Sequence, residues 1–291
     1  MKRNYGISLL HGALALCAVA VSIGDQQSFA GPVFSYQFAS SPPTSWNGVG
    51  ASGAAVTDLS SAHNDGVTTG LPVLSPIVPS GAPANAESLL TDGGGLRTNA
   101  LSLLTNAAIA ANGGFKMDAW INWDGTDNAQ HIGKIIDYAG TDYLQIQGLN
   151  LAPIVRFGFN DDVNIGTHLT APIVANTWYH VTGVFDTTGQ TIAGDGSLTG
   201  VATLYLNGVA VGTDTVAKLA ANAGTGTAGD PLNRRIGVGN FSNSGNSLLQ
   251  FRGYLYNPSV DLIPEPTTFC LFSLCLLVGS SIWRGRRGAG A

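Results

Sequence analysis

The sequence predicts an all-β domain in which two antiparallel sheets pack face to face, and three observations support this prediction. Across residues 31–262, short β-branched and aromatic runs are separated by clusters of Gly, Asn, Asp and Thr, which is typical of a β-sandwich. Several runs alternate apolar and polar side chains, as half-buried strands do. An Asn-Gly pair at 207–208 lies between two apolar runs and indicates a tight hairpin.

The clearest strand is expected at residues 115–123. Successive side chains of a strand point to opposite faces of its sheet. One face is therefore expected to carry Phe115, Met117, Ala119, Ile121 and Trp123, and the other Lys116, Asp118, Trp120 and Asn122. A second strand, at residues 178–185, places Tyr179, Val181 and Phe185 together on one side.

Residues 203–211 predict a hairpin with a type I′ turn, because both central positions of that turn need a positive φ, which Asn-Gly tolerates. The resulting register pairs Leu206 with Val209 and Leu204 with Val211. All four side chains are then expected on one face of the sheet.

The region before residue 114 is less regular. Residues 33–38 suit a first strand that closes against the last one, whereas residues 40–53 and 71–86 are rich in Pro, Gly and Ser and are expected to be long loops. Residues 101–111 are rich in Ala and Leu and favour a short helix. No internal repeat or clear linker divides the chain, so residues 31–262 are expected to form one domain, with a separate N-terminal module as the alternative.

The N-terminal residues have the composition of a targeting segment. Lys2 and Arg3 precede an apolar run at residues 9–23, and Ser28-Phe29-Ala30 offers a cleavage site with small side chains at its first and third positions. Residues 1–30 are therefore expected to be a secretory signal peptide that is absent from the mature protein.

The C-terminal residues have the composition of a membrane anchor. They contain, in order, Pro264, Glu265 and Pro266, an uncharged run at 267–283, and the basic residues Arg284, Arg286 and Arg287. As a helix, the uncharged run would span about 26 Å, slightly less than the ~30 Å hydrocarbon core of a bilayer. A single transmembrane helix with a cytoplasmic basic end is expected, and a buried helix of the domain is the alternative.

This order of a Pro-Glu-Pro motif, an apolar span and a basic end resembles the PEP-CTERM sorting signal of bacterial exported proteins, over residues 263–291. The resemblance implies that secretion machinery exports the chain, that the C-terminal helix anchors it in the membrane, and that an exosortase-type enzyme removes the anchor. The protein would then reach the cell surface or the extracellular matrix of a bacterium.

Cysteine content and charge exclude several classes of function. Cys17 lies in the expected signal peptide, and Cys270 and Cys275 lie in the expected anchor. The domain between them therefore has no disulfide, no thiolate chemistry and no Cys-bound metal. It keeps eight basic and sixteen acidic residues, a net charge near −8. Nucleic-acid binding through phosphates requires basic clusters and is not expected.

Five short segments carry a second resemblance. They are residues 115–121 (F-x-x-x-x-W-I), 176–181 (W-x-H-V), 204–209 (L-Y-x-N-G), 235–239 (I-x-V-G) and 251–255 (F-x-G-x-L). In this order they resemble the strands of laminin-G-like domains, which have the concanavalin A-like lectin/glucanase fold. The resemblance implies a jelly roll of two antiparallel sheets. The chain departs from the family at residues 254–258, where the family's usual acidic continuation is absent.

No catalytic constellation is apparent in the domain. Glycosidases need two carboxyl groups that flank one bond. Glu87 is the only glutamate between residues 31 and 263 and lies in a loop-like stretch, and the adjacent Asp161 and Asp162 would point to opposite faces of a strand. The histidines lack metal-ligand spacing, and His180 is expected to have a structural role beside Trp178.

Two loops could hold calcium, which binds several oxygen ligands. Asn160, Asp161 and Asp162 follow an expected strand at 154–159, and Asp124 and Asp127 lie in the turn after residue 123. Laminin-G-like domains often bind one calcium at such edge loops, where it also contacts glycan or protein ligands. The alternative is that these Asp and Asn residues only form turns.

Aromatic side chains could instead form a platform for sugars, because the C–H face of a pyranose stacks on an aromatic ring. The candidates are Trp46, Trp120, Trp178 and Tyr205, with packing inside the sandwich as the alternative role. Together these features predict a non-catalytic protein that binds a carbohydrate or glycoprotein in a matrix of exopolysaccharide. A structural matrix protein without a discrete ligand site is the second hypothesis, and a glycoside hydrolase is the third.

Overall fold

The computed structural model describes residues 31–39, 44–45, 52–60, 62–92, 94–98, 104–126, 132–138, 142–148, 152–159, 168–219, 235–239 and 249–263. The signal peptide expected at 1–30 and the sorting segment expected from Pro264 onward lie outside these ranges. Among the described residues, no helix is long and apolar enough to cross a membrane.

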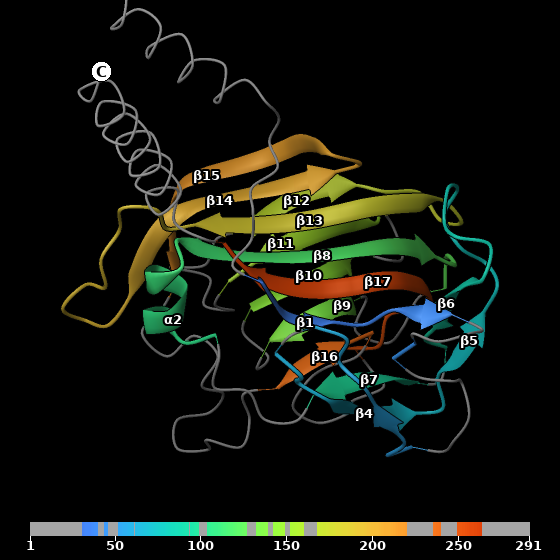
Figure 1. Ribbon diagram of the computed structural model, residues 1–291. Helices are drawn as coiled ribbons and strands as arrows, with labels where there is room; N and C mark the ends of the chain where they lie inside the picture. The colour runs from blue at the N-terminus through green and yellow to red at the C-terminus, as the bar shows by residue number, and fades with distance from the viewer. Residues whose placement is uncertain are drawn as a thin grey trace, which may run out of the picture.

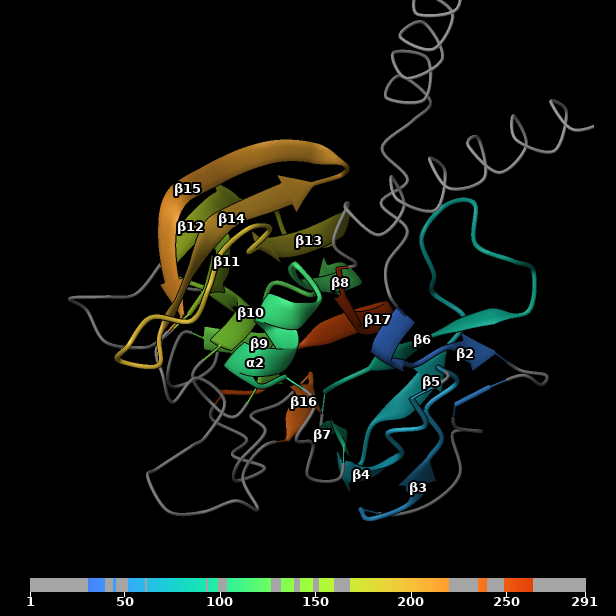
Figure 2. The ribbon, with the colours of Figure 1, turned by 60° about the vertical axis from the view of Figure 1, so that its left-hand side comes forward.

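Two antiparallel sheets lie one over the other (Figures 1 and 2). In the described part of the chain, the first sheet has nine strands in the order β15-β14-β13-β8-β17-β6-β2, with β1 beside β17 and β5 beside β6. These strands are β1 (Gly31–Ser35), β2 (Phe38–Ala39), β5 (Val73–Ser75), β6 (Ala86–Leu90), β8 (Gly114–Trp123), β13 (Trp178–Asp186), β14 (Leu198–Leu206), β15 (Val209–Leu219) and β17 (Gly253–Leu262).

The second sheet has eight described strands in the order β12-β11-β10-β9-β16-β7-β4-β3. They are β3 (Ala55–Val56), β4 (Gly66–Gly70), β7 (Gly94–Thr98), β9 (Ile132–Tyr138), β10 (Asp142–Gln147), β11 (Ile154–Gly158), β12 (His168–Pro172) and β16 (Ile236–Val238). This arrangement confirms the predicted class of an all-β fold with two antiparallel sheets, consistent with a jelly-roll sandwich. Helix α2 (Asn106–Ala111) lies at one end of the two sheets (Figure 2).

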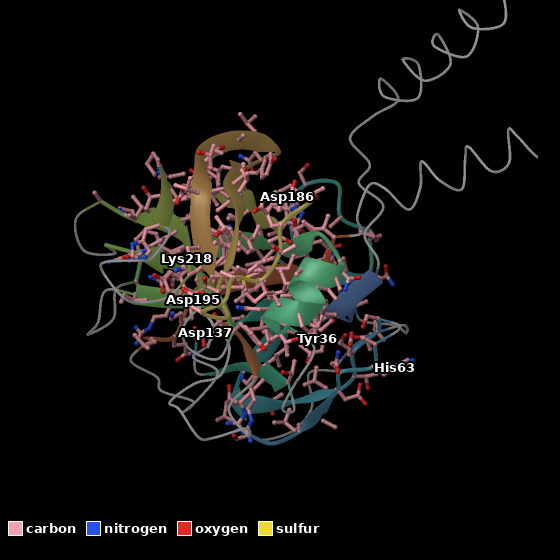
Figure 3. All side chains as sticks on the ribbon, turned by 90° about the vertical axis from the view of Figure 1, so that its left-hand side faces the viewer. Tyr36, His63, Asp137, Asp186, Asp195 and Lys218 are labelled. Carbon is pink, nitrogen blue, oxygen red and sulfur yellow. The ribbon has the colours of Figure 1, made fainter. Side chains whose placement is uncertain are left out.

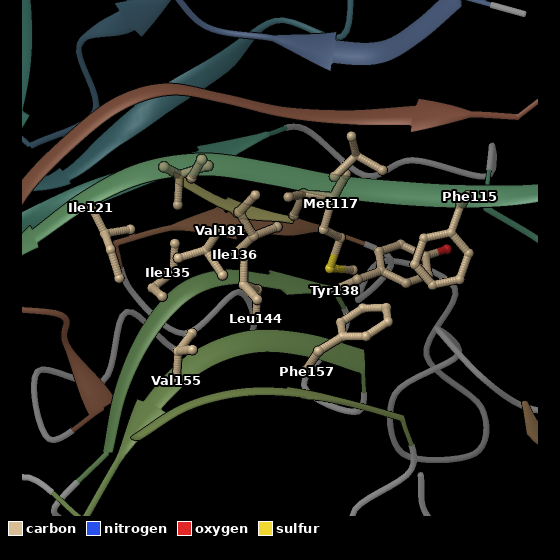
Figure 4. Close-up of a cluster of buried hydrophobic side chains, with 14 of the residues drawn as sticks. Phe115, Met117, Ile121, Ile135, Ile136, Tyr138, Leu144, Val155, Phe157 and Val181 are labelled. Atoms are coloured by element: carbon tan, nitrogen blue, oxygen red, sulfur yellow. The ribbon is translucent and has the colours of Figure 1, made fainter. Parts of the chain in front are cut away.

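The hydrophobic core lies between the sheets, and β8 supplies one side of it (Figure 4). As predicted, the odd-numbered side chains of β8 are buried, from Phe115 to Trp123, with Met117 fully inaccessible to solvent. They face residues of the second sheet such as Ile136 and Leu144 (Figure 4). The ring centroids of Phe115 and Phe157 lie 6.4 Å apart in an edge-to-face arrangement, which favours the contact beyond simple burial.

Gly183 of β13 faces Phe157 of β11 across the core. A Cβ atom at residue 183 would lie 2.3 Å from the Phe157 ring. The glycine therefore makes room for a large aromatic side chain from the opposite sheet. The even-numbered side chains of β13, from Trp178 to Asp186, are only partly buried and lie on the other face of the strand.

The predicted hairpin is present, but half of its predicted register is wrong. Asn207 and Gly208 have φ values of 52° and 78°, as a type I′ turn requires, and Leu206 pairs with Val209. A β-bulge then shifts the register, so Leu204 pairs with Gly212 instead of Val211. The four side chains consequently do not share one apolar face: Leu204 is buried, whereas Val209 and Val211 are exposed.

The irregular N-terminal region contains more strand than the sequence predicted. Strand β1 pairs with β17, which confirms that the first strand closes against the last. The stretch predicted to be a loop at 71–86 contains β5, and Glu87 lies in β6 rather than in a loop. The short helix begins at Asn106, because the Oγ1 atom of Thr105 accepts a hydrogen bond from the backbone N–H of Ala108 and caps it.

Candidate functional site

The side chains of β8 and β13 that point away from the core line an open groove on the outer face of the first sheet. The strand register places Trp120 opposite His180 and Asp118 opposite Thr182. The next strand, β14, adds Tyr205 opposite Thr182. This part of the groove has a volume of about 470 Å³, and its polar lining includes Lys116, Asp118, Thr182, Asp186 and Thr203.

A second hollow of about 470 Å³ continues the groove at its aromatic end. It is lined by Trp120, Trp178, Ser80 and the Asn207–Gly208 turn, and it shares His180 and Gly208 with the first. The two hollows therefore form one groove that follows β13 from Trp178 to Asp186. Eight residues of extended strand correspond to about 26 Å.

Stacked rings form the aromatic end of the groove. The rings of Trp120 and His180 lie 4.8 Å apart and within 19° of parallel. The ring of Trp178 contacts Tyr254 of β17, with centroids 6.4 Å apart. His180, which was predicted to have a structural role beside Trp178, packs on Trp120 and lines the same hollow as Trp178. These contacts restrict the orientation of both indole rings while leaving them half-buried at the groove.

A hydrogen-bonded cluster at Asp118 forms the polar centre of the groove. Its Oδ2 atom lies 2.9 Å from His180 Nε2, and its Oδ1 atom accepts a 2.6 Å hydrogen bond from the Thr182 hydroxyl. Burial alone raises the pKa of Asp118. The hydrogen bond and charge of His180, the charge of Lys116 and the Thr182 hydroxyl outweigh burial, so the pKa lies below its ordinary value. The carboxylate is therefore ionised at neutral pH.

The ammonium group of Lys116 is paired with a second carboxylate. Its Nζ atom lies 3.0 Å from Asp261 Oδ2, and both side chains are largely buried. Burial raises the pKa of Asp261, the charge of Asp118 raises it further, and the ion pair with Lys116 opposes both effects. The positive charge at Lys116 is thus already matched within the sheet.

These carboxylates do not form the pair that a glycosidase needs. Asp186 lies four residues along β13 from Thr182, the partner of Asp118, which is about 13 Å of strand. The two carboxyl groups of a glycosidase are about 5 to 9.5 Å apart. Asp261 is closer to Asp118 and its pKa is shifted in the opposite direction, but its Oδ2 atom is held by Lys116 and it is not among the described residues that line the groove.

The structure brings together three of the four aromatic residues predicted to bind a ligand. Trp120, Trp178 and Tyr205 all lie along this groove. Trp46 lies outside the described residues. Sequence reasoning did not identify Ser80, Asp186 or the hydrogen-bonded cluster at Asp118. Its only signal was the period-two pattern of β8 and β13, which places Asp118, Trp120, His180 and Thr182 on outer faces without giving their register.

The predicted calcium site stays a prediction. Asn160, Asp161, Asp162 and Asp127 lie outside the described residues. The carboxylate of Asp124 accepts a 2.7 Å hydrogen bond from the backbone N–H of Thr126, the geometry of a turn. Across the described ranges, no three His, Cys, Asp or Glu side chains are grouped so that they could hold a metal ion.

Comparison with known proteins gives one family match. Residues 93–255 match the family model described as "Concanavalin A-like lectin/glucanases superfamily", which is more than half of the chain. Among curated proteins, no sequence matches the chain.

Solved structures with a similar backbone include several toxin domains. The binding domain of botulinum neurotoxin serotype D/C has a TM-score of 0.47 and 14% identity, covering 80% of this chain and 49% of that chain. The receptor-binding domain of botulinum neurotoxin type G has a TM-score of 0.47 and 12% identity, covering 82% of this chain and 49% of that chain. The chain therefore spans about half the length of these structures.

Proposed function

The chain belongs to the concanavalin A-like lectin/glucanases superfamily, and we propose that it is a non-catalytic protein that binds a glycan or glycoprotein in the groove along β13. One observation carries the proposal: Trp120 and Trp178 line the same open groove as the polar cluster at Asp118. A pyranose ring has apolar C–H faces and a polar rim of hydroxyl groups. A site that offers both aromatic faces and hydrogen-bonding groups matches it.

Binding is favoured over hydrolysis because the two carboxylates that line the groove, Asp118 and Asp186, are too far apart to flank one glycosidic bond, and Asp118 is already hydrogen-bonded. The carboxylate oxygens of Asp118 already contact His180 and Thr182. Asp186 lies at the far end of β13. Prolonged incubation with any glycan that binds should therefore release no new reducing ends.

We also propose that the protein is exported and sorted to the cell surface or matrix. The support is the sequence of residues 1–30 and 263–291, which resemble a signal peptide and a PEP-CTERM segment. The secretion machinery and an exosortase-type enzyme are the partners of this proposal. The mature protein would then be the single domain at residues 31–262.

The test of glycan binding is an array of oligosaccharides, probed with the purified protein in calcium and in EDTA. We expect saturable binding to at least one glycan. Loss of glycan binding in EDTA would show that binding requires calcium. Binding in both conditions would show that no metal is required. Absence of binding in both would contradict the proposal and favour a structural matrix protein without a discrete ligand site.

A matched pair of variants tests the position of the site. Trp178→Ala removes an aromatic wall of the groove and should weaken binding at least tenfold, about 1.4 kcal/mol. Val216→Ala changes a side chain that is 74% exposed on β15 and should leave affinity unchanged. Equal affinity of the Trp178 variant and the wild type would place the site elsewhere.

A further inference from the structure

We infer that the groove selects a chain-shaped glycan with free amino groups, such as an oligomer of glucosamine. This inference rests on the proposed function and adds the chemical class and the shape of the ligand. It is carried by the charges that line the groove and by their separation from the aromatic end.

The groove has an excess of negative charge. Asp118 and Asp186 line it, and Lys116, which is paired with Asp261, is the one Lys or Arg among its described lining residues. The ammonium group of Lys116 lies 3.0 Å from Asp261, so these two charges cancel locally. His180 carries a charge only when it is protonated. Asp118 and Asp186 therefore make the net charge of the groove negative at neutral pH.

An acidic sugar would be repelled by this surface, whereas an ammonium group would be attracted. Charge complementarity of this kind discriminates between ligands of similar shape. The whole domain also favours a cationic polymer, because residues 31–263 carry a net charge near −8. Within the groove, Asp118 lies near the aromatic end and Asp186 at the opposite end of β13.

The spacing of these groups sets the length of the ligand. Trp178 and Asp186 lie at opposite ends of β13, about 26 Å apart along the extended strand. Asp186 pairs with Gly114 at the start of β8, and Figure 3 labels it in a view from the side of the molecule where α2 lies. Its Oδ1 atom accepts the backbone N–H of Thr188 at 2.8 Å, which fixes the carboxylate at this end of the groove. A single sugar cannot reach both ends, so the contacts require an oligomer that lies along β13.

The experiment is a calorimetric titration of the purified full chain with three hexamers near neutral pH, the condition under which the net charge of the groove is negative. One is a glucosamine hexamer with protonated amines, one an N-acetylglucosamine hexamer, and one a galacturonate hexamer with carboxylates. We expect the glucosamine hexamer to bind at least tenfold more tightly than the neutral hexamer, and the acidic hexamer to bind most weakly. A glucosamine dimer should bind at least tenfold more weakly than the hexamer.

Two charge-matched variants separate recognition in the groove from general attraction to an acidic protein. Asp186→Asn removes a groove carboxylate and should lower affinity for the glucosamine hexamer about five- to tenfold, with affinity for the neutral hexamer unchanged. Asp92→Asn removes the same charge from an exposed turn between β6 and β7, and should leave both affinities unchanged. An equal effect of the two variants would overturn the assignment to the groove.

The remaining outcomes distinguish the two proposals. Tight binding of the neutral or acidic hexamer, without preference for amines, would overturn the inference and leave glycan binding intact. Equal affinity of dimer and hexamer would overturn the chain-shaped ligand. No binding of any of the three hexamers, joined by a silent array, would overturn both proposals.

Discussion

Gly208 sets the backbone of the hairpin beside the groove. Its φ of 78° lies in the region that L side chains rarely adopt, yet a Cβ atom there would meet no atom within 4 Å. Replacement by Ala should therefore destabilise the protein by about 1 kcal/mol through backbone strain alone. Chemical denaturation measures the free energy of unfolding.

Gly212, in the strand β15 that follows the turn, is the control for this substitution. Its φ is outside the positive range, and its Cβ atom would make ordinary 3.6 Å contacts with Leu169. Gly212→Ala should be neutral or slightly stabilising, because alanine restricts the unfolded chain. Equal losses at residues 208 and 212 would contradict the turn assignment.

Asp118 predicts a pH dependence of stability. Its folded-state pKa lies below the ordinary value because His180, Lys116 and Thr182 together outweigh its burial. The ionised carboxylate therefore stabilises the fold above the unfolded-state pKa of about 3.9, and this stabilisation is lost as pH falls through the lower folded-state pKa. At neutral pH the free energy of unfolding of the wild type should exceed that of Asp118→Asn by about 1–2 kcal/mol.

Thermal unfolding of both proteins from neutral to strongly acidic pH measures this effect. The difference in melting temperature should shrink as the pH falls below the unfolded-state value. A difference in melting temperature that stays constant across the pH range would contradict this prediction. It would show that the charge of Asp118 does not contribute to stability.

The two sheets illustrate at the scale of elements what the sequence predicts and what it does not. The strand at Gly114–Trp123 and the Asn-Gly turn are local features, since side-chain period and turn chemistry lie within a few residues. The bulges in β15 depend on contacts with β14, and no local pattern marks them. A register predicted from the turn alone is therefore correct only as far as the first bulge.

In the candidate site, too, the residue types could be predicted from the sequence, whereas their arrangement could not. The sequence identified Trp120, Trp178 and Tyr205 as aromatic residues suited to sugars, because residue type carries that information. Their position on one outer face depends on the pairing of β8 with β13 and of β13 with β14. The contact between Asp118 and His180 joins residues 62 positions apart, a distance over which periodicity predicts nothing.

Packing between the sheets gives a prediction for Gly183. A Cβ atom there would collide with the Phe157 ring at 2.3 Å. Gly183→Ala should destabilise the protein by about 1–3 kcal/mol, because the ring or the strand must move. Gly194→Ala, where a Cβ would meet no atom within 4 Å, is the control. Unfolding measurements that give equal stabilities would show that the sheets lie further apart.

At the scale of the whole molecule, the sorting proposal for residues 263–291 gives a prediction about where the protein is found. Replacement of Pro264, Glu265 and Pro266 by alanines should leave the protein in the membrane fraction of its native host, since the processing enzyme would no longer recognise it. Fractionation and immunoblotting measure the released share. Replacement of the three alanines at 107, 108 and 110 of the domain by serine is a control that should not alter sorting. Normal release of the first variant would contradict the sorting proposal.

The most direct test of the central claim is to map a bound glycan onto the protein by nuclear magnetic resonance. The probe is the hexamer with the highest affinity of the three. The account predicts that shifts concentrate on the indole N–H groups of Trp120 and Trp178 and on backbone amides of β13 and the 207–208 turn. Shifts confined to the second sheet, or none at a saturating concentration of hexamer, would contradict a binding groove on the first sheet.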